Sequence, residues 1–148
     1  MYLKSKKLAY IPGLAWLLSY KLGDDEVHVI HGPKVESGKD HVIEGAWDGD
    51  FSSMQFDKSV LLMGSGCFIR NGFLVIATAT HTLSKVITLR SCYGMIISNS
   101  LPFLLAWTGE NLDNRHIFYN AELSSIMFGL YKCKKTIHTA SRKRIIGL

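Results

Sequence analysis

The feature that most constrains the fold is a pair of apolar segments joined by an Asn-Gly pair at 71–72. Residues 59–69 and 73–80 are rich in β-branched and large apolar side chains, which favour strands. Asn-Gly accepts the two positive φ angles of a type I′ turn and is typical of a tight hairpin. A second pair of strand-like segments follows at 86–90 and 94–97. The middle of the chain therefore predicts an antiparallel sheet.

Further strands are predicted nearer the N-terminus. A Gly-Asp-Asp turn at 23–25 separates strand-like residues 14–22 from 27–30, which predicts another hairpin. A polar turn at 37–40 precedes a short strand at 41–47.

Helical patterns appear only in the last third of the chain. Ser98 or Ser100 can cap a helix that has Pro102 in its first turn and ends at Gly109. An apolar stripe at helical spacing predicts a second helix over 120–130. Beyond Lys132 the sequence has no clear period and no closing cap, so we expect an unfinished element there.

This order of elements predicts an α+β fold, with a mostly antiparallel sheet and one or two helices on the C-terminal side. We expect a β-rich region over 1–115. Residues 116–148 would add a partial helix and a basic tail, the start of an incomplete second region.

The positive charge lies at one end of the chain. From residue 116 onward six Lys and Arg stand against one Glu, which accounts for the whole formal net charge of +5. A basic tail could bind a phosphate-rich partner, but we favour an end that belongs to a further element. The neutral body offers no basic face, so we expect no nucleic-acid partner.

The compartment is predicted from the cysteines and the N-terminus. Cys67, Cys92 and Cys133 are far apart and odd in number, which favours reduced thiols in the cytoplasm. Three lysines before the apolar run 8–18 imitate a secretory signal, but Pro-Gly at 12–13 splits the run. The run is also shorter than the roughly 20 residues that cross a bilayer, so we expect no membrane contact.

The stretch "EGAWDGDFSS" holds three acids: Glu44, Asp48 and Asp50. A calcium loop would need further oxygen ligands after them, and none follows. A catalytic carboxylate pair would need an apolar pocket that raises one pKa, which the neighbouring aromatic residues Trp47 and Phe51 could supply. We favour a solvated turn in which Asp48 caps and Gly49 adopts positive φ.

Other candidate motifs are incomplete. "GSG" at 64–66 lacks the flanking residues of a nucleophile elbow and the third glycine of a dinucleotide loop, so it indicates a bulge or a close sheet contact. His28 and His31 would point to opposite faces of a strand, which disfavours a metal site. A Cys–His pair that meets only in space stays open.

Residues 94–113, with the stretches "EGAWDGDF" and "GSG", resemble the N-terminal region of bacterial asparagine synthetase-like proteins. In that family a domain similar to class II glutamine amidotransferases, an Ntn-like fold, precedes an ATP-using synthetase domain. The resemblance extends over about residues 14–130. It implies an amidotransferase-like α+β domain in which "EGAWDGDFSS" connects into a central strand.

The departures from that family concern its chemistry. The family uses a cysteine at its processed N-terminus, whose free α-amine serves as base, but position 2 here is Tyr2. All three cysteines are internal, and the Ser-Gly-Gly-x-Asp-Ser pyrophosphate loop is absent from the sequence. We therefore expect a degenerate, truncated domain with a structural role, without catalytic, cofactor-binding or metal-binding residues. Its partner would be a synthetase domain or a second copy.

Two alternatives stay open. One is a stand-alone cytoplasmic module that binds a ligand or a protein in a pocket near Trp47, Phe51 and His81. The other is a small hydrolase that uses the carboxylates of residues 44–50.

Overall fold

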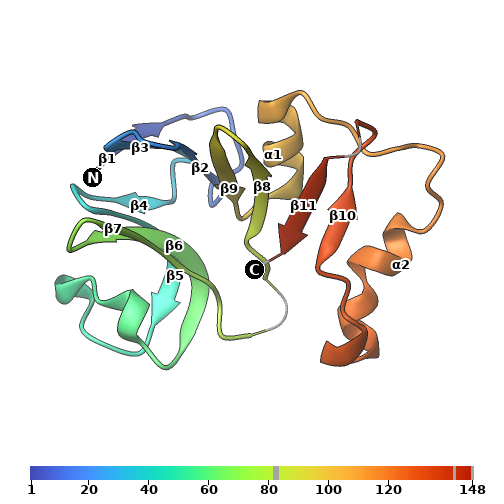
Figure 1. Cartoon of the computed structure of the whole chain (residues 1–148). Coiled ribbons are helices and arrows are strands. Elements are labelled where there is room, and N and C mark those ends of the chain that lie inside the picture. The colour runs from blue at the N-terminus through green and yellow to red at the C-terminus, as the bar shows by residue number, and fades with distance from the viewer. Residues whose placement is uncertain (82–83, 142, 148) are drawn as a thin grey trace.

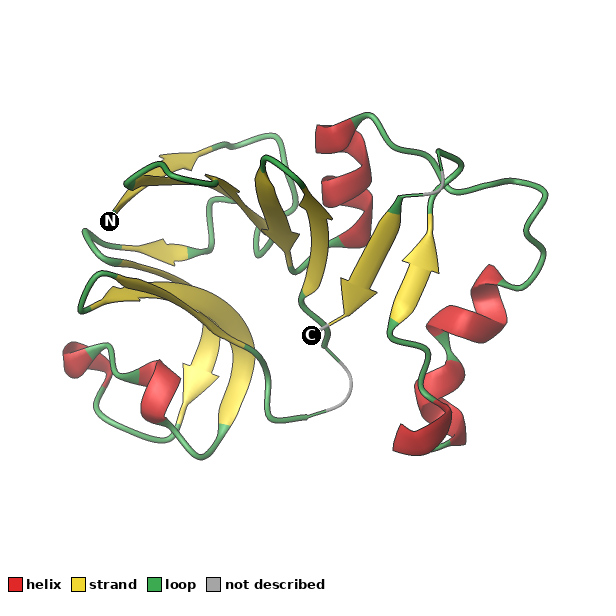
Figure 2. Ribbon diagram, viewed as in Figure 1, coloured by secondary structure: helices red, strands yellow, loops and turns green. Residues whose placement is uncertain are grey.

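The computed structural model describes residues 1–81, 84–141 and 143–147, and it contains two β-sheets (Figures 1 and 2). The strands of the larger sheet are β1 (Tyr2–Lys7), β2 (Trp16–Lys21), β3 (Glu26–His31), β8 (Ile87–Ser91), β9 (Gly94–Ser98), β10 (Thr136–His138) and β11 (Arg144–Gly147). They lie in the order β1-β3-β2-β9-β8-β11-β10. The smaller sheet follows chain order and consists of β4 (Glu36–Ser37), β5 (His41–Trp47), β6 (Leu62–Arg70) and β7 (Phe73–Ala77).

The helical elements are short. Two are α-helices, α1 (Leu101–Thr108) and α2 (Tyr119–Leu123). Four are 3₁₀ helices, η1 (Phe51–Ser53), η2 (Phe56–Lys58), η3 (Ser125–Phe128) and η4 (Leu130–Lys132). Among the described strands only β1 and β3 pair in parallel. The predicted α+β class with mostly antiparallel sheet and C-terminal helices is confirmed.

The predicted hairpins are confirmed as well. Asn71 and Gly72 both have positive φ, 51° and 77°, between β6 and β7. Strands β2 and β3 pair around the turn at 23–25, and β8 pairs with β9. Local turn chemistry therefore sets the register of these strands.

The two sheets pack face to face over the β1–β3–β2–β9 half of the larger sheet. Their shared core is apolar and is formed by Leu3, Trp16, Leu18, Val27, Val29, Val35, Val42, Cys67, Ile69, Val86 and Ile97. Helix α1 covers the opposite face, where Leu104 packs on Ile87, Leu89 and Ile145. The molecule is thus layered as small sheet, large sheet and helix (Figure 2).

Helix α1 has the predicted ends. Ser100 is its N-cap, and the Ser100 hydroxyl accepts a hydrogen bond from the Phe103 N–H. Pro102 lies in the first turn, and Gly109 ends the helix with φ 68°.

The helix predicted over 120–130 is only partly present. α2 ends at Leu123, and 3₁₀ turns replace the rest. The Ser124 and Ser125 hydroxyls donate to the backbone carbonyls of Asn120 and Glu122, at 2.5 and 2.6 Å, and Gly129 has φ 101°. Short polar side chains that bond the backbone, followed by a glycine with positive φ, end a helix early.

The expectation of an unfinished element after Lys132 is wrong for the described residues. β10 and β11 form a hairpin, and β11 pairs with β8, with Ile145 opposite Leu89. The hairpin is fixed by Glu110, which accepts hydrogen bonds from Lys143 at 2.6 Å and from Ser141. The Lys143 ammonium holds the pKa of Glu110 below its usual range. Strands from both sides of the predicted boundary at 115/116 therefore share one sheet.

The N-terminal strand β1 was also not predicted. It lies at the edge of the larger sheet, where Leu3 is buried and the other five residues, three of them lysines, are exposed. Lysines on an edge strand oppose pairing with other chains. Within the described residues, no helix has the length and apolar character needed to cross a membrane.

Candidate functional site

Polar side chains from both sheets meet at one place between the sheets. Trp16 begins β2, Glu44 lies on β5, Ser65 lies on β6, and Asn99 follows β9. We call these four residues the intersheet polar cluster. Glu44 and Ser65 are opposite each other in the β5–β6 ladder, so strand register alone brings them together.

Hydrogen bonds join the four side chains into a chain. Trp16 Nε1–H donates to Ser65 Oγ at 3.1 Å, and Ser65 Oγ–H donates to Glu44 Oε1 at 2.9 Å. Asn99 Nδ2 reaches Glu44 Oε1 at 3.3 Å and the Leu14 carbonyl at 2.9 Å. Asn99 Oδ1 accepts from the Trp16 N–H at 2.9 Å. The cluster therefore ties the small sheet to the large one.

Of the three carboxyl groups in "EGAWDGDFSS", that of Glu44 has an unusual environment. Burial raises the pKa of Glu44, and hydrogen bonds from Ser65 and Asn99 and the charge of His81 oppose that rise. A carboxyl group beside a hydroxyl is the arrangement of a base and a nucleophile. However, Ser65 is only 2% exposed and already accepts from Trp16, which leaves no route for a substrate to the hydroxyl.

Asp48 and Asp50 lie in an exposed loop and do not join Glu44. Asp48 accepts from the Ser59 hydroxyl and from the Leu61 N–H, and Asp50 caps η1 by accepting from Ser52. These hydrogen bonds hold the pKa of both carboxyls below the usual range. The preferred interpretation as a turn is right for these two residues, but the helix cap is Asp50.

The positive φ expected at Gly49 is not found there and occurs instead at Gly45, with φ 120°. Gly45 faces Gly64, which has φ 142°, across the β5–β6 ladder. A Cβ on Gly64 would lie 2.0 Å from the Glu44 carbonyl oxygen. The expected close sheet contact at 64–66 is therefore confirmed, and it places Glu44 beside Ser65.

Of the remaining candidates, His81 and Cys133 line the same cavity, whereas the two histidines of β3 do not meet. His28 is exposed and His31 is buried, on opposite faces of β3 as predicted. Among the described residues, no group of three His, Cys, Asp or Glu side chains could hold a metal ion. His81 borders a cavity of about 340 Å³, but neither Trp47 nor Phe51 lines it. Those two rings lie 4.3 Å apart, at the end of β5 and in η1.

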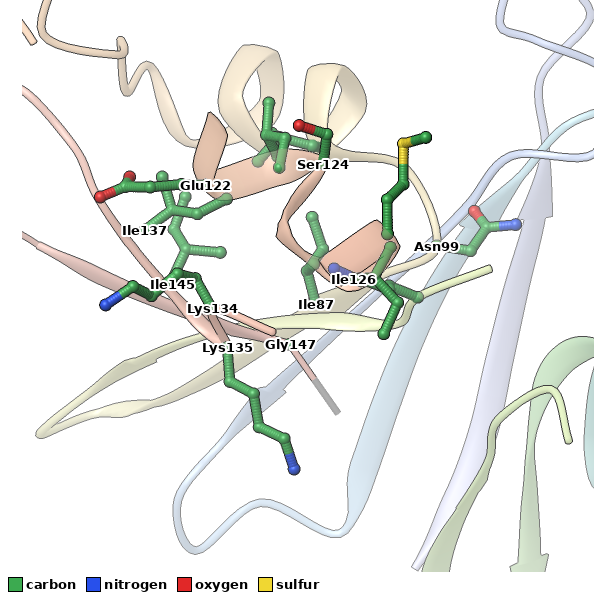
Figure 3. Close-up of a pocket in the computed structure, with 14 residues that line it drawn as sticks. Ile87, Asn99, Glu122, Ser124, Ile126, Lys134, Lys135, Ile137, Ile145 and Gly147 are labelled. Carbon is green, nitrogen blue, oxygen red and sulfur yellow. The ribbon is translucent and has the colours of Figure 1, made fainter. Parts of the chain in front are cut away.

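A separate, mostly apolar cavity of about 440 Å³ lies on the helix side of the large sheet (Figure 3). Its floor is formed by Ile87, Ile137 and Ile145, and residues 122–127 form a wall. Asn99 also lines it, so one residue borders both this cavity and the intersheet polar cluster. We call this cavity the apolar groove.

The sequence indicated some of these residues and missed others. Glu44 was singled out as a carboxylate and Ser65 only as part of a glycine motif. Neither Trp16 nor Asn99 belongs to a sequence pattern that predicts a site. The only signal for Asn99 was its place between a strand and a helix cap, where a side chain can bond neighbouring backbone.

Replacing Glu44 with Gln is expected to change how stability depends on pH. Because the pKa of Glu44 is raised in the folded state, its contribution to stability is complete below the ordinary Glu pKa. That contribution is lost as pH rises through the pKa of the folded state. Gln can still accept from Ser65 and Asn99 but carries no charge. Glu44→Gln should therefore gain stability relative to wild type as pH rises from about 4 to 7.

The measurement is urea unfolding at several pH values. Asp50→Asn is the matched control, because the lowered pKa of Asp50 makes its contribution to stability depend on pH in the opposite direction. Above the ordinary Asp pKa, the free energy of unfolding of wild type should exceed that of Asp50→Asn. That difference should shrink on acidification. Equal pH slopes for wild type and Glu44→Gln would contradict the assignment.

Comparisons of the chain with models of known protein families, with curated proteins and with solved structures find no match. The proposed function therefore depends on the residues and geometry described above.

Proposed function

We propose that this chain is a catalytically inactive domain similar to the amidotransferase half of asparagine synthetase-like proteins, with a structural role beside a synthetase domain. The α+β architecture with mostly antiparallel sheet is what the resemblance implies, and it supports the proposal. In this role the domain would supply a rigid surface to its partner, while the partner would carry the chemistry.

The observation that carries the proposal is the environment of Tyr2, the position at which the enzyme class needs its nucleophile. Tyr2 lies on the edge strand β1 and is 55% exposed. Its hydroxyl donates to Glu26 Oε2 at 3.1 Å. The Tyr2 side chain therefore faces solvent at the edge of the large sheet.

The described cysteines offer no replacement for that nucleophile. Cys67 is fully buried in the core between the sheets, and burial raises its pKa to about 12, so it stays a neutral thiol. Cys92 is exposed in the two-residue turn between β8 and β9, which offers no enclosed site. Cys133 is internal to the chain and therefore has no free α-amine.

The test is to measure glutamine hydrolysis and ATP pyrophosphatase activity on purified protein. We expect neither rate to exceed that of a buffer blank, and measurable glutamine turnover would overturn the proposal. The partner is tested separately, by sequencing the reading frame downstream of this chain, which we expect to encode a synthetase-like domain, and by co-expressing that product with the chain. Co-purification at a fixed ratio is expected. Failure of that domain to bind would remove the structural role.

A stand-alone binding module is the second candidate, and the apolar groove favours it. A cavity of about 440 Å³ with mainly apolar walls is within the range of small-ligand sites. This candidate predicts a monomer that unfolds cooperatively and gains thermal stability with a ligand, without any need of a protein partner.

A further inference from the structure

The apolar groove continues into an unusually exposed apolar surface. Met127, which lines the groove, is 83% exposed. Large apolar side chains on the same stretch, residues 117–131, are also exposed: Ile117, Phe118, Leu123, Phe128 and Tyr131. Six large exposed apolar side chains within fifteen residues exceed the scattered single ones of an ordinary surface, which favours a protein interaction site.

The groove has a positive border. Lys85, Lys134 and Lys135 line it, and no described carboxylate forms an ion pair with any of them. Its one acidic lining residue, Glu122, is already engaged, since Glu122 Oε2 lies 3.1 Å from His116 Nε2. In Figure 3 the Glu122 carboxylate points away from the isoleucines of the floor.

From this combination we propose that the groove and the exposed apolar residues of 117–131 form a docking site for an acidic amphipathic helix of a partner protein. Apolar side chains of the helix would fill the groove over Ile87 and Ile145, and its carboxylates would face the three lysines. This deepens the proposed structural role and rests on it in that both require a protein partner. The likeness to amidotransferases can fail while the docking site stands.

The positive charge of the groove and the extent of the exposed apolar side chains favour an acidic helix over a second copy or a small molecule. A second copy would bring the same lysines and a net charge of +5 to the contact, which opposes pairing. A small anionic molecule could fill the groove, but it would leave Ile117, Phe118 and Tyr131 uncovered. A segment of a protein can cover both the groove and these side chains.

Addition of a strand at the edge of the large sheet is disfavoured as well. β10 is the edge strand beside the groove, but the Tyr119 hydroxyl donates to the His138 carbonyl at 2.6 Å. The Ala140 N–H donates to the Asn111 carbonyl at 2.8 Å, and Leu112 bridges to Thr139. Part of this edge is therefore occupied, which favours helix-in-groove docking at this place over strand addition.

The test uses a designed helical peptide of about 18 residues, or five turns, with leucines along one stripe and glutamates beside it. Binding to the full chain is measured by fluorescence anisotropy. We expect saturable binding that weakens as salt is raised. A peptide with lysine at every glutamate position should bind at least about tenfold more weakly. Absence of saturable binding by the glutamate peptide would overturn the proposal.

Variants locate the site. Met127→Glu should weaken binding of the glutamate peptide at least about tenfold, because it places a negative charge on the apolar surface. The double variant Lys134→Glu with Lys135→Glu should reverse the preference between the two peptides. Tyr10→Glu is the control, since Tyr10 is equally exposed but lies outside the lining of the groove. Equal loss with Tyr10→Glu would contradict this location.

Two further measurements distinguish the other occupants. A concentration-dependent dimer that Met127→Glu dissociates would assign the surface to a second copy and overturn the proposal. Dodecanoate that binds the groove while the glutamate peptide does not would assign it to a small anionic amphiphile. These outcomes are independent of glutaminase activity, so the docking site and the amidotransferase likeness can be judged separately.

Discussion

Replacement of Gly64 with Ala is expected to lower the free energy of unfolding by about 3–5 kcal/mol, from strained backbone and overpacking together. A Cβ on Gly64 would lie 2.0 Å from the Glu44 carbonyl oxygen, and its φ of 142° is unfavourable for alanine. Backbone lies on both sides of the contact, so no flexible side chain can move to relieve it. A loss of this size is a large part of the roughly 5–15 kcal/mol that stabilises a domain.

Gly23→Ala is the matched control. Gly23 also has positive φ, 93°, but a Cβ there would meet no atom within 4 Å. It should therefore show only the conformational cost, about 1–2 kcal/mol. Urea unfolding followed by circular dichroism gives both values. If Gly64→Ala is no worse than Gly23→Ala, the close approach of β5 and β6 is not a feature of the protein.

Truncation of Trp16 to Ala is the second large effect that we expect, about 3–5 kcal/mol of lost stability. Trp16 is fully buried between the sheets, where it packs in the main core. Its loss would leave a cavity and would also leave Ser65 Oγ without the indole donor. Both consequences act at the point where the two sheets are joined.

Two variants separate these contributions. Trp16→Phe keeps most of the apolar volume but removes the Nε1–H, so it should cost less than the alanine variant. Trp107→Ala is the control for the loss of an indole, because Trp107 is about half exposed on α1. It should cost under about 1 kcal/mol. Equal losses for the alanine variants at 16 and 107 would contradict a central role for Trp16.

Local features of the fold could be predicted from the sequence because their signals are local. The Asn-Gly pair at 71–72 specifies its own turn, and Ser100, Pro102 and Gly109 specify the ends of α1. Strand β1 escapes prediction because three of its six residues are lysines, and the β10–β11 hairpin because its strands have only three and four residues. Their stability comes from pairing with β3 and β8, which are distant in sequence.

The candidate site could be predicted only in part for a similar reason. Glu44 belongs to an acidic stretch that attracts notice, but its raised pKa depends on the packing of the two sheets. The contacts of Trp16 with Ser65 and of Asn99 with Glu44 join residues 49 and 55 positions apart. The apolar groove likewise exists only where residues 122–127 meet strands β8, β10 and β11.

The place of β11 between β8 and β10 has a consequence for synthesis of the protein. Strand β8 leaves the ribosome well before β11 does, so the nascent chain carries an unpaired β8 edge with Ile87 and Leu89 beside it. Such an unpaired edge favours binding to other nascent chains and to chaperones during translation. Ribosomes stalled before residue 144 should therefore hold an aggregation-prone intermediate.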